Sequence, residues 1–170
     1  MWGQKINWFA TRKLTYSDFK NKIEPDKSSF RHENAAHLKR AASSTIGWNY
    51  EITSSTTNDN IDLKIYAFFD PTKSWMKNEY KNEYVLNHEQ KHFDIAEIYK
   101  RKLQQRIKKE IKGKKDFERK FDQLYHQVYT EYCDFQKKYD SETLHGTIVE
   151  KQQEFDVLIT DMLSQQSQKN

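Results

Sequence analysis

The segment NEYVLNHEQKHFDIAEIYKRKL, residues 82–103, carries two histidines four positions apart and a glutamate directly after the first. On a helical wheel that advances about 100° per residue, His88 and His92 fall in one apolar stripe, and Glu89 lies beside them. The same stripe contains Val85, Ala96, Tyr99 and Leu103, and the opposite, polar side contains Asn87, Gln90, Asp94, Glu97 and Arg101. The pattern predicts an amphipathic helix that places two imidazoles and one carboxylate on its buried face.

Buried imidazoles need partners, and a metal ion can supply one. Side chains four residues apart on a helix are about 5–6 Å apart at Cβ, so His88 and His92 can bind one zinc ion through bonds of about 2.0–2.1 Å. Glu89 is turned away from the point where the two rings converge, in a position to accept a proton from water at the metal. We therefore predict a zinc site with Glu89 as the general base. The alternative is a pair of core histidines that are hydrogen-bonded to neighbouring groups.

A catalytic zinc ion needs a third protein ligand, and this helix offers none beyond His92. His32 and His37 are five residues apart, which suits a helical chelate poorly, and His126 lies in a segment predicted to pack as a helix. The distant segment YDSETLHGT, residues 139–147, is a better source, because three possible ligands are concentrated in it: Asp140, Glu142 and His145.

His145 is predicted to be the third metal ligand, because a neutral imidazole matches its two partners. Gly146, the next residue, permits close approach of the backbone. Glu142 is the alternative ligand, and it would make the site His-His-Glu. In the alternative without a metal, Ser141 or Thr143 caps the following helix and His145 is incidental.

The first third of the chain predicts short, mixed elements. QKINWFA, residues 4–10, alternates loosely and predicts an edge strand. TIGWNYEITSS, residues 45–55, and IDLKIYAFFD, residues 61–70, predict two strands of a hairpin that Pro71 ends. Two short helical segments are also predicted, with caps or starts at Ser17 and at Ser28 or Ser29.

The remainder is predicted to be helical. Helix formers fill the chain from about Lys77 to Lys138 with Gly113 as the only break, which predicts a helical hairpin or a long broken helix. The apolar positions of a third amphipathic helix are Ile148, Phe155, Leu158, Ile159 and Met162. Residues 164–170 are predicted to form a disordered tail. The expected fold is α+β in a single domain, residues 1–170, because this length suits one core.

Composition restricts the class of protein. Aromatic residues make up 14% of the chain and hydrophobic residues only 35%, which predicts a core built largely from rings. Cys133 is the single cysteine, so no intramolecular disulfide can form. No stretch is long and apolar enough for a transmembrane helix, and the first residues lack the regions of a signal peptide. We expect a soluble globular protein.

The sequence also resembles a known family through four segments: KLTYSDF, SWMK, HEQKHFDIAEIYKRKL and YDSETLHGTIVEKQQ. It is similar to a bacterial zinc-dependent protease family, first catalogued as a domain of unknown function, whose members carry HEQxHFDI and a distant T-x-HG segment. The resemblance implies a zincin-like α+β domain in which a small antiparallel sheet packs on a long HExxH helix with two further helices. It also implies zinc ligands at His88, His92 and His145, with Glu89 as catalytic acid and base. Lys91 stands where a small residue is expected.

The resemblance implies a zinc metallopeptidase that acts on a peptide or protein substrate and is periplasmic or secreted. It also suggests that the substrate lies along residues 61–69 as an edge strand, and Tyr139 is a candidate for oxyanion binding or for core packing. Two alternatives remain: a zincin-like protein that binds zinc without catalysis, and a helical module that holds an acidic partner with RIKKEIKGKK, residues 106–115. We expect no nucleic-acid partner, because acidic residues are interspersed with the basic ones and no binding signature is present.

Overall fold

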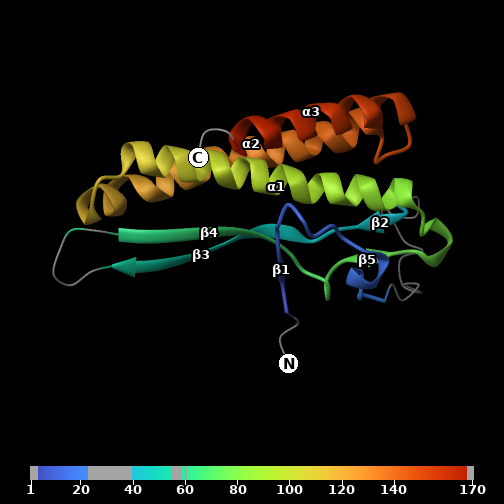
Figure 1. Cartoon of the computed structure of the whole chain (residues 1–170), viewed down its shortest axis with the longest axis horizontal. Coiled ribbons are helices and arrows are strands. Elements are labelled where there is room, and N and C mark those ends of the chain that lie inside the picture. Colours follow the sequence, from blue (N-terminus) through green and yellow to red (C-terminus); the bar gives the residue numbers. More distant parts are fainter. Residues whose placement is uncertain (1–3, 23–39, 55–58, 60, 168–170) are drawn as a thin grey trace, which may run out of the picture.

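The computed structural model describes residues 4–22, 40–54, 59 and 61–167. It confirms the α+β fold, with small antiparallel sheets packed against three helices (Figure 1). The three-stranded sheet has the order β1-β4-β3, formed by β1 (Ile6–Asn7), β4 (Ile61–Phe69) and β3 (Ile46–Ser54). The second sheet pairs β2 (Ala42–Ser43) with β5 (Trp75–Met76). The helices are α1 (Glu83–Glu110), α2 (Lys114–Thr143) and α3 (Val149–Ser167). Two short 3-10 helices, η1 (Tyr16–Asp18) and η3 (Asn78–Tyr80), precede α1.

The hairpin of β3 and β4 is confirmed, with a register that places Trp48 opposite Ala67. Both residues are buried, and apolar positions alternate along β4 because one face of the sheet packs on the helices. The prediction that residues 61–69 form an edge strand is wrong for the end of β4, which lies between β3 and β1 at Phe68 and Phe69. Along the rest of β4, β3 is the only strand that pairs with it among the described residues. β1 itself is at the edge, as predicted.

The long helical hairpin is confirmed, and its ends have identifiable causes. Asn82 caps α1 by accepting a hydrogen bond from the Val85 amide at 2.9 Å. Gly113 separates α1 from α2, and the Asp59 carboxylate accepts a hydrogen bond from the Lys114 amide at 3.1 Å. A Cβ atom at Gly113 would lie 2.0 Å from Asp59 Oδ2, so a larger residue here would displace the Asp59 carboxylate from the start of α2.

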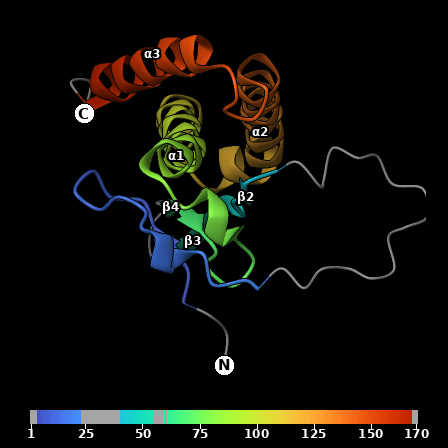
Figure 2. The ribbon, with the colours of Figure 1, turned by 90° about the vertical axis from the view of Figure 1, so that its right-hand side faces the viewer.

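Helix α1 is the central element, because the sheet lies on one side of it and α2 and α3 lie on the other (Figure 2). Because α1 is covered on both sides, the helical wheel was wrong about which side of this helix is exposed. The supposed polar side of α1 is buried, with Gln90 at 7%, Asp94 at 1% and Glu97 at 4% exposure. Asp94 accepts a hydrogen bond from Trp8 Nε1 at 2.9 Å, and the Gln90 side chain accepts one from the backbone amide of Leu14 at 2.8 Å. Asp94 and Gln90 therefore bind the N-terminal segment rather than solvent, whereas Glu97 pairs with Lys100 and Arg101 of α1.

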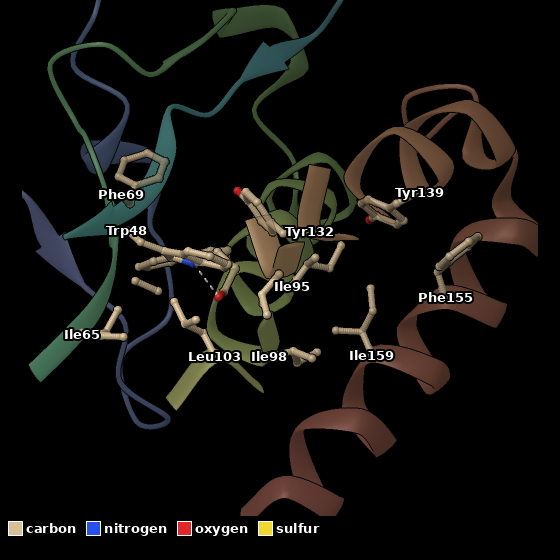
Figure 3. Close-up of a cluster of buried hydrophobic side chains, with 14 of the residues drawn as sticks. Trp48, Ile65, Phe69, Ile95, Ile98, Leu103, Tyr132, Tyr139, Phe155 and Ile159 are labelled. Carbon is tan, nitrogen blue, oxygen red and sulfur yellow. Dashed lines mark hydrogen bonds between the residues drawn. The ribbon is translucent and has the colours of Figure 1, made fainter. Parts of the chain in front are cut away.

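The core between the sheet and the helices is rich in rings, as composition predicts (Figure 3). Trp48 lies at its centre and donates a hydrogen bond from Nε1 to the carbonyl of Ala96 at 2.9 Å. Three tyrosines of α2 surround the Trp48 ring at centroid distances between 5.1 and 5.9 Å: Tyr125, Tyr129 and Tyr132. This packing attaches α1 and α2 to the sheet and positions the face on which the two histidines lie.

Smaller differences concern the short elements and the C-terminal helix. η1 is capped by Thr15 rather than by Ser17, because the Asp18 carboxylate reaches back to the Thr15 amide at 2.8 Å. The predicted third helix is present, but Leu158 is 43% exposed. Residues 164–167, which the sequence assigns to a disordered tail, form the end of α3.

The helix predicted at Ser28 or Ser29 starts outside the described residues, and the single domain stays a prediction. No described helix has the length and apolar character needed to cross a membrane.

Candidate metal centre

Two histidines of α1 and one aspartate of α2 meet in a compact triangle. His88 Nε2 lies 3.2 Å from His92 Nε2, and both nitrogens face Asp140 Oδ1, at 3.4 Å and 3.2 Å. Among the described residues these three form a group of ligand atoms that could hold a metal ion. The spacing of four residues on α1 brings the rings together, as the sequence predicts. Asp140 is supplied by the facing helix, α2.

The orientation of each ring is fixed by a glutamine on its far side. His92 Nδ1 lies 2.5 Å from Gln136 Oε1, and the amide nitrogen of Gln136 donates to the backbone carbonyl of His92 at 2.9 Å. His88 Nδ1 lies 2.9 Å from Gln152 Oε1, and the amide nitrogen of Gln152 donates to Asp156 Oδ1 at 2.8 Å. Because each glutamine presents its oxygen to the imidazole, we assign the proton of both rings to Nδ1.

This assignment leaves the inner nitrogens of His88 and His92 without protons. Two nitrogen lone pairs and a carboxylate oxygen then lie within 3.4 Å of one another, and none of the three can donate a hydrogen bond to the others. Such a group needs a positive charge at its centre, either a proton or a metal ion. The outer glutamines have the arrangement that orients metal-binding histidines in other proteins. The donor set therefore fits a cation.

The end of α2 brings His145 back towards the same carboxylate. Leu144, His145 and Gly146 all have positive φ, at 46°, 54° and 79°. Left-handed backbone is costly for residues with a Cβ atom, and such strain is often found at functional sites. The turn places His145 Nδ1 3.1 Å from Asp140 Oδ1. A Cβ atom on Gly146 would lie 3.1 Å from Cγ and Nδ1 of His88, so glycine allows the turn to pack on the metal-facing ring.

His145 itself lies beside the triangle and is not part of the group of converging ligand atoms. Its side chain is 45% exposed, whereas that of His88 is 6% exposed. The alternative ligand, Glu142, has its carboxylate 3.8 Å from Lys138 Nζ and also lies outside the group. No observation here tests His145 as a ligand, and it stays a prediction.

Glu89 is buried, with 4% exposure, next to the triangle. Its Oε2 atom accepts a short hydrogen bond from the hydroxyl of Ser44, which directly follows β2. Oε1 has no hydrogen-bond partner within the part of the chain that the structure describes. The carboxylate is close enough for its charge to raise the pKa of His92. Glu89 thus has one oxygen held in place and one oxygen available to a proton donor.

The remaining candidates have structural positions. Tyr139 is fully buried and stacks on the ring of His88 with centroids 4.8 Å apart, so its place is in the core. Burial, with the charges of nearby carboxylates, raises the pKa of the Tyr139 hydroxyl despite a hydrogen bond from Gln152. Lys91 contacts α3, with Nζ 3.1 Å from the hydroxyl of Thr160, so a long side chain packs there without entering the triangle. His32 and His37 lie outside the described residues.

The electrostatics of the triangle link its protonation to folding. Burial lowers the pKa of His92, but the hydrogen bond with Asp140, the charges of Glu89 and Asp140 and the contact with Gln136 together raise it above its ordinary value. Burial raises the pKa of Asp140, yet when a proton takes the place of a metal between Asp140 and the inner nitrogens of His88 and His92, the hydrogen bonds that form and the nearby imidazole charges hold this pKa well below its usual range. A charged His92 and an ionised Asp140 are thus both favoured in the folded, metal-free chain.

We expect the metal-free protein to lose stability as the pH rises above about 6.5, the ordinary pKa of histidine. A raised pKa for His92 means that protonation stabilises the fold at lower pH, and this contribution is lost as the pH passes through the folded pKa. One proton gives a slope of at most about 1.4 kcal/mol per pH unit. Urea unfolding with a chelator present, between about pH 6 and 9, measures it. The slope should be smaller in His92→Gln, and an equal slope in both proteins would contradict the assignment.

The fold and this site define a small α+β protein with a candidate metal centre on an HExxH helix. The chain belongs to a bacterial family, because the model of the family described as "Bacterial protein of unknown function (DUF922)" matches residues 6–146. The matched range contains both halves of the site, from the HEQKH motif to His145 and Gly146. No curated protein and no solved structure matches the chain significantly. The family description gives no activity, so it confirms the family resemblance but not the protease function.

Sequence reasoning missed Gln136 and Gln152 as parts of this site. It named Asp140 among three possible ligands but preferred His145, with Glu142 as the alternative, and the helix was expected to end near Lys138. In the structure α2 continues to Thr143, so Gln136 and Asp140 lie one helical turn apart on the side that faces α1. The sequence did contain a signal for these two residues: Gln136 and Asp140 follow the buried Tyr132 at intervals of four residues, so all three lie on one side of the helix.

Proposed function

We propose that this protein is a zinc-dependent peptidase, in which His88, His92 and Asp140 bind the metal and Glu89 is the catalytic acid and base. The observation that carries the proposal is the triangle of ligand atoms with a buried carboxylate next to it. Peptide or protein substrates and a periplasmic or secreted location follow from the resemblance to zinc-dependent proteases, and they are part of the same proposal.

Zinc is the metal that the donor set favours. Two neutral imidazoles with one carboxylate are typical ligands of catalytic zinc, whereas calcium and magnesium prefer oxygen ligands. In a tetrahedron with bonds of about 2.0–2.1 Å, neighbouring ligand atoms are about 3.3–3.4 Å apart. The edges of the triangle are 3.2, 3.2 and 3.4 Å. The three side chains therefore already have the spacing of one face of a zinc tetrahedron.

Asp140 is a better third ligand than His145 on this geometry. Its Oδ1 atom faces both inner nitrogens, while the known contact of His145 is with Asp140 itself. With three protein ligands, a tetrahedral zinc ion keeps one position for water or substrate, as catalysis requires. We assign His145 a positioning role, in which its ring holds the Asp140 carboxylate from the more exposed side.

When bound, zinc would polarise the scissile carbonyl and lower the pKa of a water molecule. Glu89 would accept the proton of the attacking water through Oε1 and then donate it to the leaving nitrogen. Ser44 holds Oε2, so the carboxylate keeps one orientation through both proton transfers. Because Ser44 directly follows β2, an extended peptide near Glu89 would lie next to β2 and the start of β3, rather than along β4 as the sequence suggested.

The purified protein should bind about one zinc ion per chain, and a chelator should lower its melting temperature. A ligand that binds only the folded state stabilises it by about 2.7 kcal/mol at a free concentration one hundred times the dissociation constant. Elemental analysis and thermal melts with and without chelator measure both quantities. Indifference to added zinc in a verified metal-free preparation would favour the core-histidine alternative. A matched control is His126→Ala, which changes a histidine of α2 outside the triangle and should leave zinc binding unchanged.

A further inference from the structure

Among the described residues, one edge of β4 has no strand paired with it along most of its length. β1 lies opposite Phe68 and Phe69 alone, and the last contact on this side is a hydrogen bond from the Trp8 amide to the carbonyl of Ala67 at 2.9 Å. Backbone groups alternate in direction along a strand, so every second residue from Ala67 directs its amide and carbonyl to this edge. The residues so placed are Ile61, Leu63 and Ile65. Within the described chain, their backbone groups have no partner on this side.

A groove of mixed lining, with apolar residues in the majority, runs beside the open edge. It has a volume of about 300 Å³ and lies between β4 and the second half of α1. These two elements run alongside each other in Figure 1. Six of its lining residues are apolar: Ile61, Leu63, Ile65, Ile107, Ile111 and Phe117. Most of these side chains are half-buried. An open strand edge with such a groove next to it is the kind of surface that accepts a further strand.

The segment IDLKI, Ile61 to Ile65, is self-complementary when two copies of it pair as antiparallel strands. When it pairs antiparallel with a second copy about a two-fold axis at Leu63, Ile61 faces Ile65 and Asp62 faces Lys64. The apolar residues then share the helix side of the sheet, and each acidic residue meets a basic one on the outer side. Asp62 and Lys64 are both more than 60% exposed on that outer side, where they lie 3.8 Å apart, so solvent-exposed charges can exchange this weak contact for one with a partner.

We propose that the protein forms a homodimer in which two β4 strands pair antiparallel at this edge and join the two sheets into one. The pairing gives backbone partners to Ile61, Leu63 and Ile65 in both copies, with about six new hydrogen bonds. It also covers the groove of each copy with the isoleucines of the other. The free edge of β3 lacks this complementarity, because a two-fold axis at Tyr50 would place Asn49 opposite Glu51.

Charge exchange in the full chain tests the proposal. Asp62→Lys alone places two pairs of lysines opposite each other, and Lys64→Asp alone does the same with aspartates. Each single variant should weaken the dimer at least about tenfold, because like charges in directly opposite positions are destabilising. The double variant Asp62→Lys with Lys64→Asp restores opposite charges and should recover the dimer, as should a mixture of the two single variants.

Sedimentation between about 1 µM and about 1 mM protein measures the monomer–dimer equilibrium. Asn49→Lys is the matched control, because it adds a charge to the same outer side of the sheet on β3 and should not change the dimer. Circular dichroism and melting temperatures show whether each variant is folded. A wild-type protein that stays monomeric over this range overturns the proposal, as does a dimer that is equally stable in both single variants.

Amide hydrogen exchange gives a second readout that needs no variant. The amides of Ile61, Leu63 and Ile65 should exchange more slowly as the dimer forms. Those of Asp62 and Lys64 should change little, because they already face β3. Protection of all five amides to the same degree, or of none, would overturn the pairing even if a dimer exists.

Discussion

Glu89→Gln is expected to remove most peptide hydrolysis while leaving the fold and the bound zinc unchanged. A glutamine amide cannot accept the proton of the attacking water, and general-base catalysis typically contributes about 100-fold to 10,000-fold to the rate. Glutamine has nearly the same shape, and it can still accept the hydrogen bond from Ser44 through its oxygen. The loss should therefore appear in kcat, measured on a peptide that a library screen has identified as cleaved by the wild-type protein.

Glu142→Gln is the matched control for this variant. It changes a carboxylate near the end of α2, but Glu142 is exposed and lies next to Lys138 rather than the triangle. Its activity should equal that of the wild type. Full activity in a zinc-loaded Glu89→Gln protein would contradict the proposed role of Glu89. Loss of zinc in this variant would show that the carboxylate supports the metal instead. A wild type that binds zinc but cleaves nothing in the library would favour the non-catalytic alternative.

Asp140→Asn is expected to weaken zinc binding on the order of 100-fold to 1,000-fold, about one ligand's share of a protein zinc site. The neutral amide is a poor metal ligand and removes the negative charge that faces His88 and His92. His145→Ala should cost about tenfold or less if its ring only orients the carboxylate. Competition with a chelator of known affinity measures these differences.

The order of these two effects decides the third ligand. A larger loss in His145→Ala than in Asp140→Asn would restore His145 as the ligand, as predicted from the sequence. Because Asp140 is ionised in the folded metal-free chain, Asp140→Asn also changes stability without metal. Melting curves of the metal-free variants separate that effect from zinc affinity.

The main architecture could be predicted from the sequence because the local signals agree with the tertiary structure. The alternation in β3 and β4, the cap at Asn82 and the break at Gly113 are local features, and the structure confirms the elements that they indicate. The convergence of His88 and His92 is also local, since both lie on one face of one helix.

What could not be predicted depends on contacts between distant segments. A helical wheel assumes one buried side, but α1 is covered by the sheet and by two helices, so Gln90, Asp94 and Glu97 are buried as well. The hydrogen bonds of Gln90 and Asp94 with the N-terminal segment join residues more than seventy positions apart. The position of β4 in the middle of its sheet has the same origin, because β1 comes from the start of the chain.

Asp140 was not preferred over Glu142 and His145 for a related reason. The sequence between Lys138 and Thr147 has turn-forming residues, which suggested a loop, and a loop ligand was expected at its centre near Glu142 or His145. Packing of Tyr139 against His88 and burial of Thr143 extend α2 through this segment. The carboxylate that faces the histidines is therefore a helical residue, one turn after Gln136.

The position of the metal in a crystal structure, from anomalous scattering measured on both sides of the zinc absorption edge, tests the proposed zinc site most directly. We expect one strong zinc peak per chain, about 2.0–2.2 Å from His88 Nε2, His92 Nε2 and one oxygen of Asp140, with Glu89 outside the bonded ligands. Crystals grown with zinc that show no peak at the triangle, and instead show the two imidazoles hydrogen-bonded to Asp140, would contradict this site.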